Sequence, residues 1–214
     1  MPAIRLRHQC TPREEVANSL THGLAMLLSI VGLVIMVLMA SRRGDIWQVV
    51  SFSVFGSSLI LLYLASTLYH TVSQPTAKRF LKIFDHSAIY VLIAGSYTPF
   101  LLVALRGVWG WSIFGVVWGL AIAGILMKCL FIERFHNMSI VLYLLMGWLC
   151  VVAFKQLLAN LSHLSLMLLV FGGLSYTLGV VFYIWRKLPY NHAVWHLFVM
   201  GGSAFHYFSV LSTL

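Results

Sequence analysis

Three histidines interrupt an apolar run near the C-terminus, in the stretch NHAVWHLFVMGGSAFH from residue 191 to residue 206. His192 and His196 are four residues apart, so on a helix their imidazoles share one face. Two imidazoles at this spacing can bind one metal ion from a single helix. An interhelical hydrogen bond is the alternative role for any single histidine within a membrane. The pair therefore marks a candidate metal site, with both interpretations open.

Ser66 and His70 form a second pair with a four-residue spacing, and Asp85 lies in the next apolar segment. His70 can supply a third nitrogen from a neighbouring helix. Three protein ligands leave one coordination position open, which is the layout of catalytic zinc. Asp85 can then orient a ligand or hold a reacting water, although it can equally cap its own helix or pair with Lys82. Ser66 taken alone is more often a small packing residue.

His206 does not fit this candidate site. It lies fourteen residues beyond His192, which corresponds to about 21 Å along a straight helix. The Gly201-Gly202 pair can bend a helix, but not over that distance. We therefore expect His206 to make an interhelical hydrogen bond within the packing of the fold.

The composition indicates the environment in which these residues work. The chain has 214 residues, 61% hydrophobic and only 9% charged, with a mean hydropathy of +0.93. Soluble domains carry roughly 25% charged residues, whereas a bilayer accommodates such an apolar excess at about 20 residues per helical span. We predict an all-α integral membrane bundle of seven transmembrane helices. The apolar runs are about Leu20–Ala40, Trp47–Tyr69, Ile83–Leu105, Val108–Leu130, Ser139–Leu157, Leu164–Trp185 and His192–Leu214.

A helix start precedes the first apolar run. Thr11, Pro12 and Glu14 are typical of a capping box with proline at the first helical position. Helix one, or a short amphipathic lead-in to it, therefore begins near Thr11 and carries polar side chains on adjacent turns, namely Glu15, Asn18 and His22. We expect residues 1–19 to form a cytoplasmic N-terminal segment with this lead-in and residues 20–214 to form the seven-helix domain.

The Lys and Arg residues divide unequally between the two sides of the predicted bundle. Of the 14 in the chain, ten fall on one side: Arg5, Arg7, Arg13, Lys78, Arg79, Lys82, Lys128, Arg134, Arg186 and Lys187. The remaining four are Arg42, Arg43, Arg106 and Lys155. Because cytoplasmic loops carry the excess, the N-terminus is predicted to be cytoplasmic and the C-terminus external. The net charge of +9 then reflects membrane topology rather than a nucleic-acid partner.

Four motifs in order, EVANSLTH, STLYH, DHSAIYVLIAGSYTPF and NHAVWHLFVMGGSAFH, resemble the hemolysin III family. That family lies within the wider progestin and adipoQ receptor group, which includes the adiponectin receptors. The resemblance implies a seven-helix fold with its N-terminus inside and Zn²⁺ held by the histidines matching His70, His192 and His196. It places Ser66 and Asp85 beside the metal. It also suggests a bacterial-type member in the inner (plasma) membrane.

Three functions follow from this resemblance. We favour a part in membrane lipid and fluidity homeostasis, with membrane lipids as partners. The alternative is a zinc-dependent lipid amide hydrolase, similar to ceramidases, with a lipid amide or fatty acid as ligand. Asp85 would then act as base or orienter, and Ser66 would hydrogen-bond the substrate carbonyl. The second alternative is the pore-forming activity suggested by the family name, although nothing in the sequence indicates secretion or a polar channel lining.

Overall fold

The computed structural model describes residues 10–131 and 136–214, and every regular element within those ranges is helical. This confirms the all-α class. The elements are α1 (Pro12–Arg43), α2 (Ile46–Thr71), α3 (Pro75–Pro99), η1 (Phe100–Ala104), α4 (Val108–Phe131), α5 (His136–Gly147), η2 (Trp148–Ala153), α6 (Phe154–Asn160), α7 (His163–Ile184) and α8 (Asn191–Leu211).

The predicted capping box starts α1. The Thr11 hydroxyl accepts a hydrogen bond from the Glu14 backbone N–H, and the Glu14 carboxylate accepts one from the Thr11 N–H at 2.8 Å. This reciprocal pairing satisfies two donors that a helix otherwise leaves open. The helix then runs without a break to Arg43, so the predicted lead-in and the first apolar run are parts of one helix.

Two helix ends fix the position of the candidate site. α2 ends at Thr71, and the Gln74 side chain accepts from Ala77 N–H at 2.6 Å to start α3. α8 starts after Tyr190, which has a left-handed backbone with φ of 55°. The Asn191 amide donates to the last carbonyls of α7, which ties the start of α8 to its neighbour.

Six helical segments are long and apolar enough to cross a membrane: Pro12–Arg43, Ile46–Thr71, Pro75–Ala104, Val108–Phe131, Met138–Asn160 and His163–Ile184. Many large apolar side chains point outward from them, such as Leu20 at 68% exposed and Val108 at 86% exposed. Outward leucines and valines suit lipid rather than water. α8 has 21 residues but is not among the six, because its histidines, glycines and serines lower its hydropathy.

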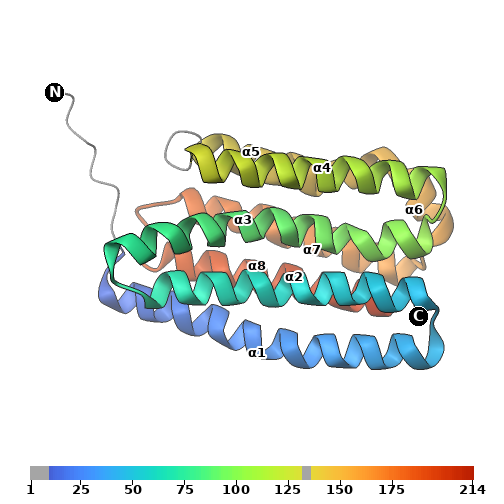
Figure 1. The fold of residues 1–214 in the computed structure, drawn as a ribbon, viewed down its shortest axis with the longest axis horizontal. Helices are drawn as coiled ribbons and strands as arrows, with labels where there is room; N and C mark the ends of the chain where they lie inside the picture. Colours follow the sequence, from blue (N-terminus) through green and yellow to red (C-terminus); the bar gives the residue numbers. More distant parts are fainter. Residues whose placement is uncertain (1–9, 132–135) are drawn as a thin grey trace.

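The helices run roughly side by side along the long axis of the molecule (Figure 1). The start of α1 and the C-terminus lie at opposite ends (Figure 1). At one end, Tyr190 N–H donates to the Glu14 carboxylate at 3.1 Å, so the starts of α8 and α1 are adjacent. At the other end, the Gln48 amide donates to the Thr213 carbonyl at 3.3 Å. The first end therefore collects the starts of α1, α3 and α8 and the end of α2.

The segment from α5 to α6 breaks its regular helix at η2. The Tyr97 hydroxyl, from α3, accepts from Cys150 N–H at 2.9 Å and donates to the Gly147 carbonyl at 2.7 Å. A side chain thus supplies hydrogen bonds that the interrupted backbone lacks, as non-helical backbone at membrane depth requires.

Candidate metal centre

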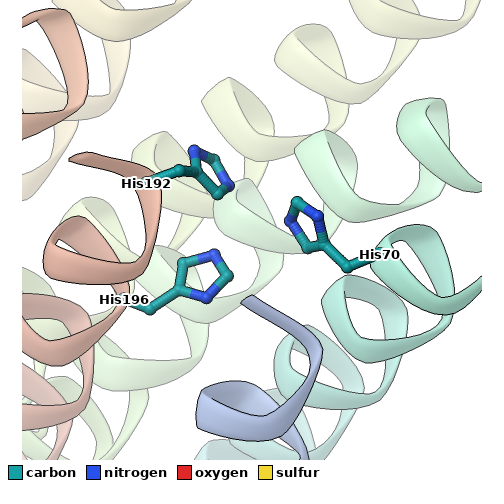
Figure 2. Close-up of side chains that lie close together, drawn as sticks. All are labelled: His70, His192 and His196. Carbon is teal, nitrogen blue, oxygen red and sulfur yellow. The ribbon is translucent and has the colours of Figure 1, made fainter. Parts of the chain in front are cut away.

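His70, His192 and His196 come together from two helices. His70 lies in the last turn of α2, whereas His192 and His196 lie in the first two turns of α8. One ligand nitrogen from each lies within 4.8 Å of the other two, and the three rings converge on a common space (Figure 2). Small side-chain rotations would bring them to the zinc–nitrogen distances of about 2.0–2.1 Å. The three residues fit a single metal ion.

Glu15 orients the imidazole of His70. Its Oε2 lies 2.6 Å from His70 Nδ1, and its Oε1 accepts from Lys78 Nζ at 2.8 Å. A carboxylate only accepts, so Nδ1 carries a proton, and Nε2 is the nitrogen left for a metal. That Nε2 is buried and has no hydrogen-bond partner among the described residues. A carboxylate behind a histidine is the usual support of a metal ligand.

His196 is oriented in the same way by α1. Its Nδ1 lies 3.2 Å from the Asn18 carbonyl oxygen and 3.0 Å from Thr21 Oγ1. The Thr21 hydroxyl has backbone carbonyls to which it can donate, so its oxygen is free to accept. The Nδ1–H of His196 therefore donates to α1, which leaves Nε2 for a metal. α1 supports a ligand from α2 and a ligand from α8.

Asp85 and Ser66 lie beside the three histidines. Both are buried, and the Ser66 hydroxyl hydrogen-bonds the Asp85 carboxyl. Asp85 lies close enough to His70 to interact with it electrostatically, but it is outside the group of three mutually close ligand atoms. This arrangement suits a carboxyl that assists a bound group rather than one that ligates the metal.

A cavity of about 240 Å³ extends from these residues into the bundle. Ser66, Asp85, His192 and His196 line its polar end, and the rest of its wall is mostly apolar. At its other extreme the wall is formed by apolar side chains of η1 and the residue after it, of α4 and of α6, namely Phe100, Leu101, Leu105, Ile113, Phe154 and Leu157. A long apolar space that ends in polar groups has the form of a site for an amphiphile.

The structure places His206 apart from the metal centre, as predicted. Its ring packs edge-on against Tyr176, with centroids 5.4 Å apart. It lies near the Leu169 backbone, yet neither ring nitrogen makes a hydrogen bond of good geometry with a described residue. The packing role agrees with the sequence prediction, but the expected interhelical hydrogen bond is not formed.

Two features escaped the sequence analysis. The spacing of Glu15, Asn18 and His22 placed them on adjacent turns, but it did not show that α1 supports the histidines of other helices. Lys128 was counted with the charges of the cytoplasmic side, whereas the structure buries it at 2% exposed in the last turn of α4, where it lines the cavity. Arg5, Arg7 and Arg134 lie outside the described residues.

Comparison with known proteins identifies the family of the chain. The chain matches the family described as haemolysin-III related over residues 10–207. It is 51% identical to the Hemolysin-3 homolog of Bacillus subtilis (strain 168) over 201 residues, which are 94% of each chain. It is 50% identical to Hemolysin-3 of Bacillus cereus over 199 residues, covering 93% of this chain and 91% of the relative. The human Monocyte to macrophage differentiation factor is 31% identical over 212 residues, covering 95% and 86%.

The apolar helices and the bacterial relatives together identify a multi-pass integral protein of the bacterial plasma membrane.

Proposed function

Because this chain belongs to the haemolysin-III-related family, we propose that it is a zinc-containing membrane protein that takes part in membrane lipid and fluidity homeostasis. The observation that carries the proposal is the meeting of three converging histidines, two of them oriented by α1, with an apolar cavity of about 240 Å³. The cavity suits a lipid chain, and the histidines suit a metal at its polar end.

The choice of zinc rests on the donor set. Imidazole suits zinc, copper, iron and nickel, and zinc is common in sites with three protein nitrogens and one open position. His70 and His196 both keep Nε2 for a metal, because their Nδ1–H groups donate to the Glu15 carboxylate and the Asn18 carbonyl oxygen. When bound, zinc would supply a Lewis acid that polarises a carbonyl oxygen.

The proposal includes α8 as a seventh span and a cytoplasmic metal centre. The opposite positions of the α1 start and the C-terminus fit an odd number of crossings (Figure 1), and the Lys/Arg asymmetry puts the N-terminus inside. A reporter fused after Leu214 is expected to be external, and one inserted after Gln74 is expected to be cytoplasmic. A cytoplasmic C-terminal reporter would contradict the seventh span.

The proposed function is tested by metal analysis combined with lipidomics. Purified protein is expected to hold about one zinc per chain, and cells lacking or overproducing it are expected to change lipid composition in opposite directions. A variant with His192 and His196 both replaced by Ala serves as the metal-free control. Unchanged lipids in all strains, or full restoration by the control variant, would overturn a zinc-dependent role in lipid homeostasis.

A second function, zinc-dependent lipid amide hydrolysis, is favoured by Asp85 and Ser66. Both line the cavity next to His192 and His196, where a carboxyl can accept a proton and a hydroxyl can hydrogen-bond a carbonyl. The pore-forming alternative has less support, because the cavity wall is mostly apolar and conduction of ions requires polar groups along the path.

A further inference from the structure

His22 is a buried imidazole to which the metal centre gives no role. The residue is 3% exposed, and neither ring nitrogen has a hydrogen-bond partner in the described part of the chain. It is also outside the group of three mutually close metal ligands. A buried polar group without a partner is unfavourable, and proteins satisfy such groups with protein atoms, water or a ligand.

The position of His22 points to the contents of the cavity. Its ring stacks on His196 with centroids 3.4 Å apart and planes 11° apart, and it meets the ring of Tyr63 edge-on at 4.9 Å. These contacts fix the plane of the His22 ring. His22 lines the same cavity as Asp85 and His196, so a molecule that fills the polar end of the cavity lies against the His22 ring.

The hydrogen-bonding capacity of the His22 ring limits which chemical group can pair with it. A charge is costly at this depth, and a neutral imidazole has one N–H donor and one nitrogen acceptor. A hydroxyl or an amide can both donate and accept. An ester only accepts, and an ammonium only donates.

We propose that His22 binds the head group of a lipid in the cavity and selects a neutral group that both donates and accepts hydrogen bonds. The proposal rests on the proposed function, because it requires a lipid to occupy the cavity. It assigns His22 to the lipid rather than to the metal: stacking keeps the ring beside His196, and its nitrogens are left for the head group.

The test uses three probes with the same chain length: dodecanol, dodecanamide and methyl dodecanoate. Native mass spectrometry of the purified protein in nanodiscs reports zinc and bound probe on the same molecule. The alcohol and the amide can pair with either nitrogen of the His22 ring, whereas the ester can pair only with its N–H. We therefore expect them to bind wild-type protein about five- to tenfold more tightly than the ester, which corresponds to one hydrogen bond of typical strength. A preference for only one of the two distinguishes a hydroxyl from an amide as the natural head group.

His22→Phe keeps a ring that can stack on His196 but has no nitrogen. We expect it to retain zinc and to bind all three probes within about twofold of one another. His22→Gln keeps a donor and an acceptor, so it should retain part of the preference, and it provides the test if His22→Phe does not fold. Tyr63→Phe is the matched control: it loses the hydroxyl that bonds Ser203 at 2.7 Å but keeps the ring against His22, and it should behave as wild type.

The outcomes separate the two proposals. If His22→Phe keeps the wild-type preference, or if the wild type shows none, water satisfies the ring and the head-group proposal is overturned. If wild-type protein holds no zinc but still prefers the alcohol or amide, the metal centre fails and the His22 proposal stands. Zinc without binding of any probe overturns both the lipid-binding role and the role of His22.

Discussion

The two halves of α8 hold chemically identical side chains in different surroundings. In the first half, His196 donates to the Asn18 carbonyl, and His192 faces His70 across the site with ring centroids 4.9 Å apart. In the second half, His206 has ring packing against Tyr176 and no hydrogen bond of good geometry among the described residues. One helix therefore carries two candidate ligands, of which His196 is oriented by α1, and, further along, an imidazole held by packing.

The difference lies in the neighbouring helices rather than in α8 itself. α1 presents Asn18, Thr21 and Glu15 to the first half and its partner His70. In the second half, His206 faces Gly172 of α7, which has no side chain that could accept a hydrogen bond. A histidine that binds a metal through one ring nitrogen usually donates the N–H of its other ring nitrogen to a neighbouring acceptor.

The largest expected effect is the loss of zinc on removal of a ligand. His70→Ala, His192→Ala and His196→Ala each leave two nitrogens, so zinc should fall from about one per chain to near zero. His206→Ala should keep its zinc, because its ring takes no part in the site. Elemental analysis of the purified variants checks this. Full zinc content in the variant with both His192 and His196 replaced by Ala would contradict the assignment of these two histidines as metal ligands.

The Asp85→Asn variant tests whether the site at the first half of α8 catalyses a reaction or only binds a metal ion. Asparagine has nearly the same shape but cannot accept a proton at neutral pH. The three histidines remain, so zinc should stay, whereas hydrolysis of a lipid amide should fall by roughly 10²–10⁴-fold. The assay compares zinc content and amide hydrolysis with those of His70→Ala. Wild-type behaviour of Asp85→Asn in both assays would leave zinc as a structural link between α2 and α8.

Glu15→Gln tests the support from α1 with a smaller change. The amide oxygen can still accept from His70, but it lacks the charge that strengthens the bond at 2.6 Å. Loss of such support typically lowers metal affinity by about 10–100-fold, and competition with a chelator measures it. Glu14→Gln, with the same loss of charge one residue away, should change zinc affinity little. Equal effects at both positions would indicate a general effect of charge rather than orientation of His70.

The sequence predicted well the features that depend only on residues close together along the chain. Helical periodicity placed His192 with His196 and Ser66 with His70, and the capping box located the start of α1 at Thr11. The hydropathy of a segment is an average over its residues. It therefore identified the lipid-facing segments but did not predict that Lys128, counted with the charges of the cytoplasmic side, has a buried side chain.

Contacts between segments that are distant along the chain could not be predicted from the sequence. Nothing in the spacing of Glu15 and Asn18 says which histidines they orient, because that depends on how α1 packs against α2 and α8. For the same reason, the sequence did not show that the predicted interhelical hydrogen bond of His206, which lies near the Leu169 backbone of α7, lacks good geometry. The position of His206 along the bundle was predictable, but its neighbour on α7, Gly172, was not.

The smallest expected effect concerns that neighbour. A β-carbon at Gly172 would overlap the ring of His206 and approach the Gly202 carbonyl at 3.2 Å. Gly172→Ala should therefore destabilise the protein by about 1–3 kcal/mol, measured as a lower melting temperature in detergent, while zinc content stays unchanged. Gly173→Ala is the matched control, since its new methyl group meets the Trp148 ring at an ordinary 3.5 Å. Combining Gly172→Ala with His206→Ala removes the ring that is overlapped, so the two changes should be less than additive. Loss of zinc in Gly172→Ala alone would show that the two halves of α8 are coupled, and the packing of His206 would then help to position the ligands about three to four turns away.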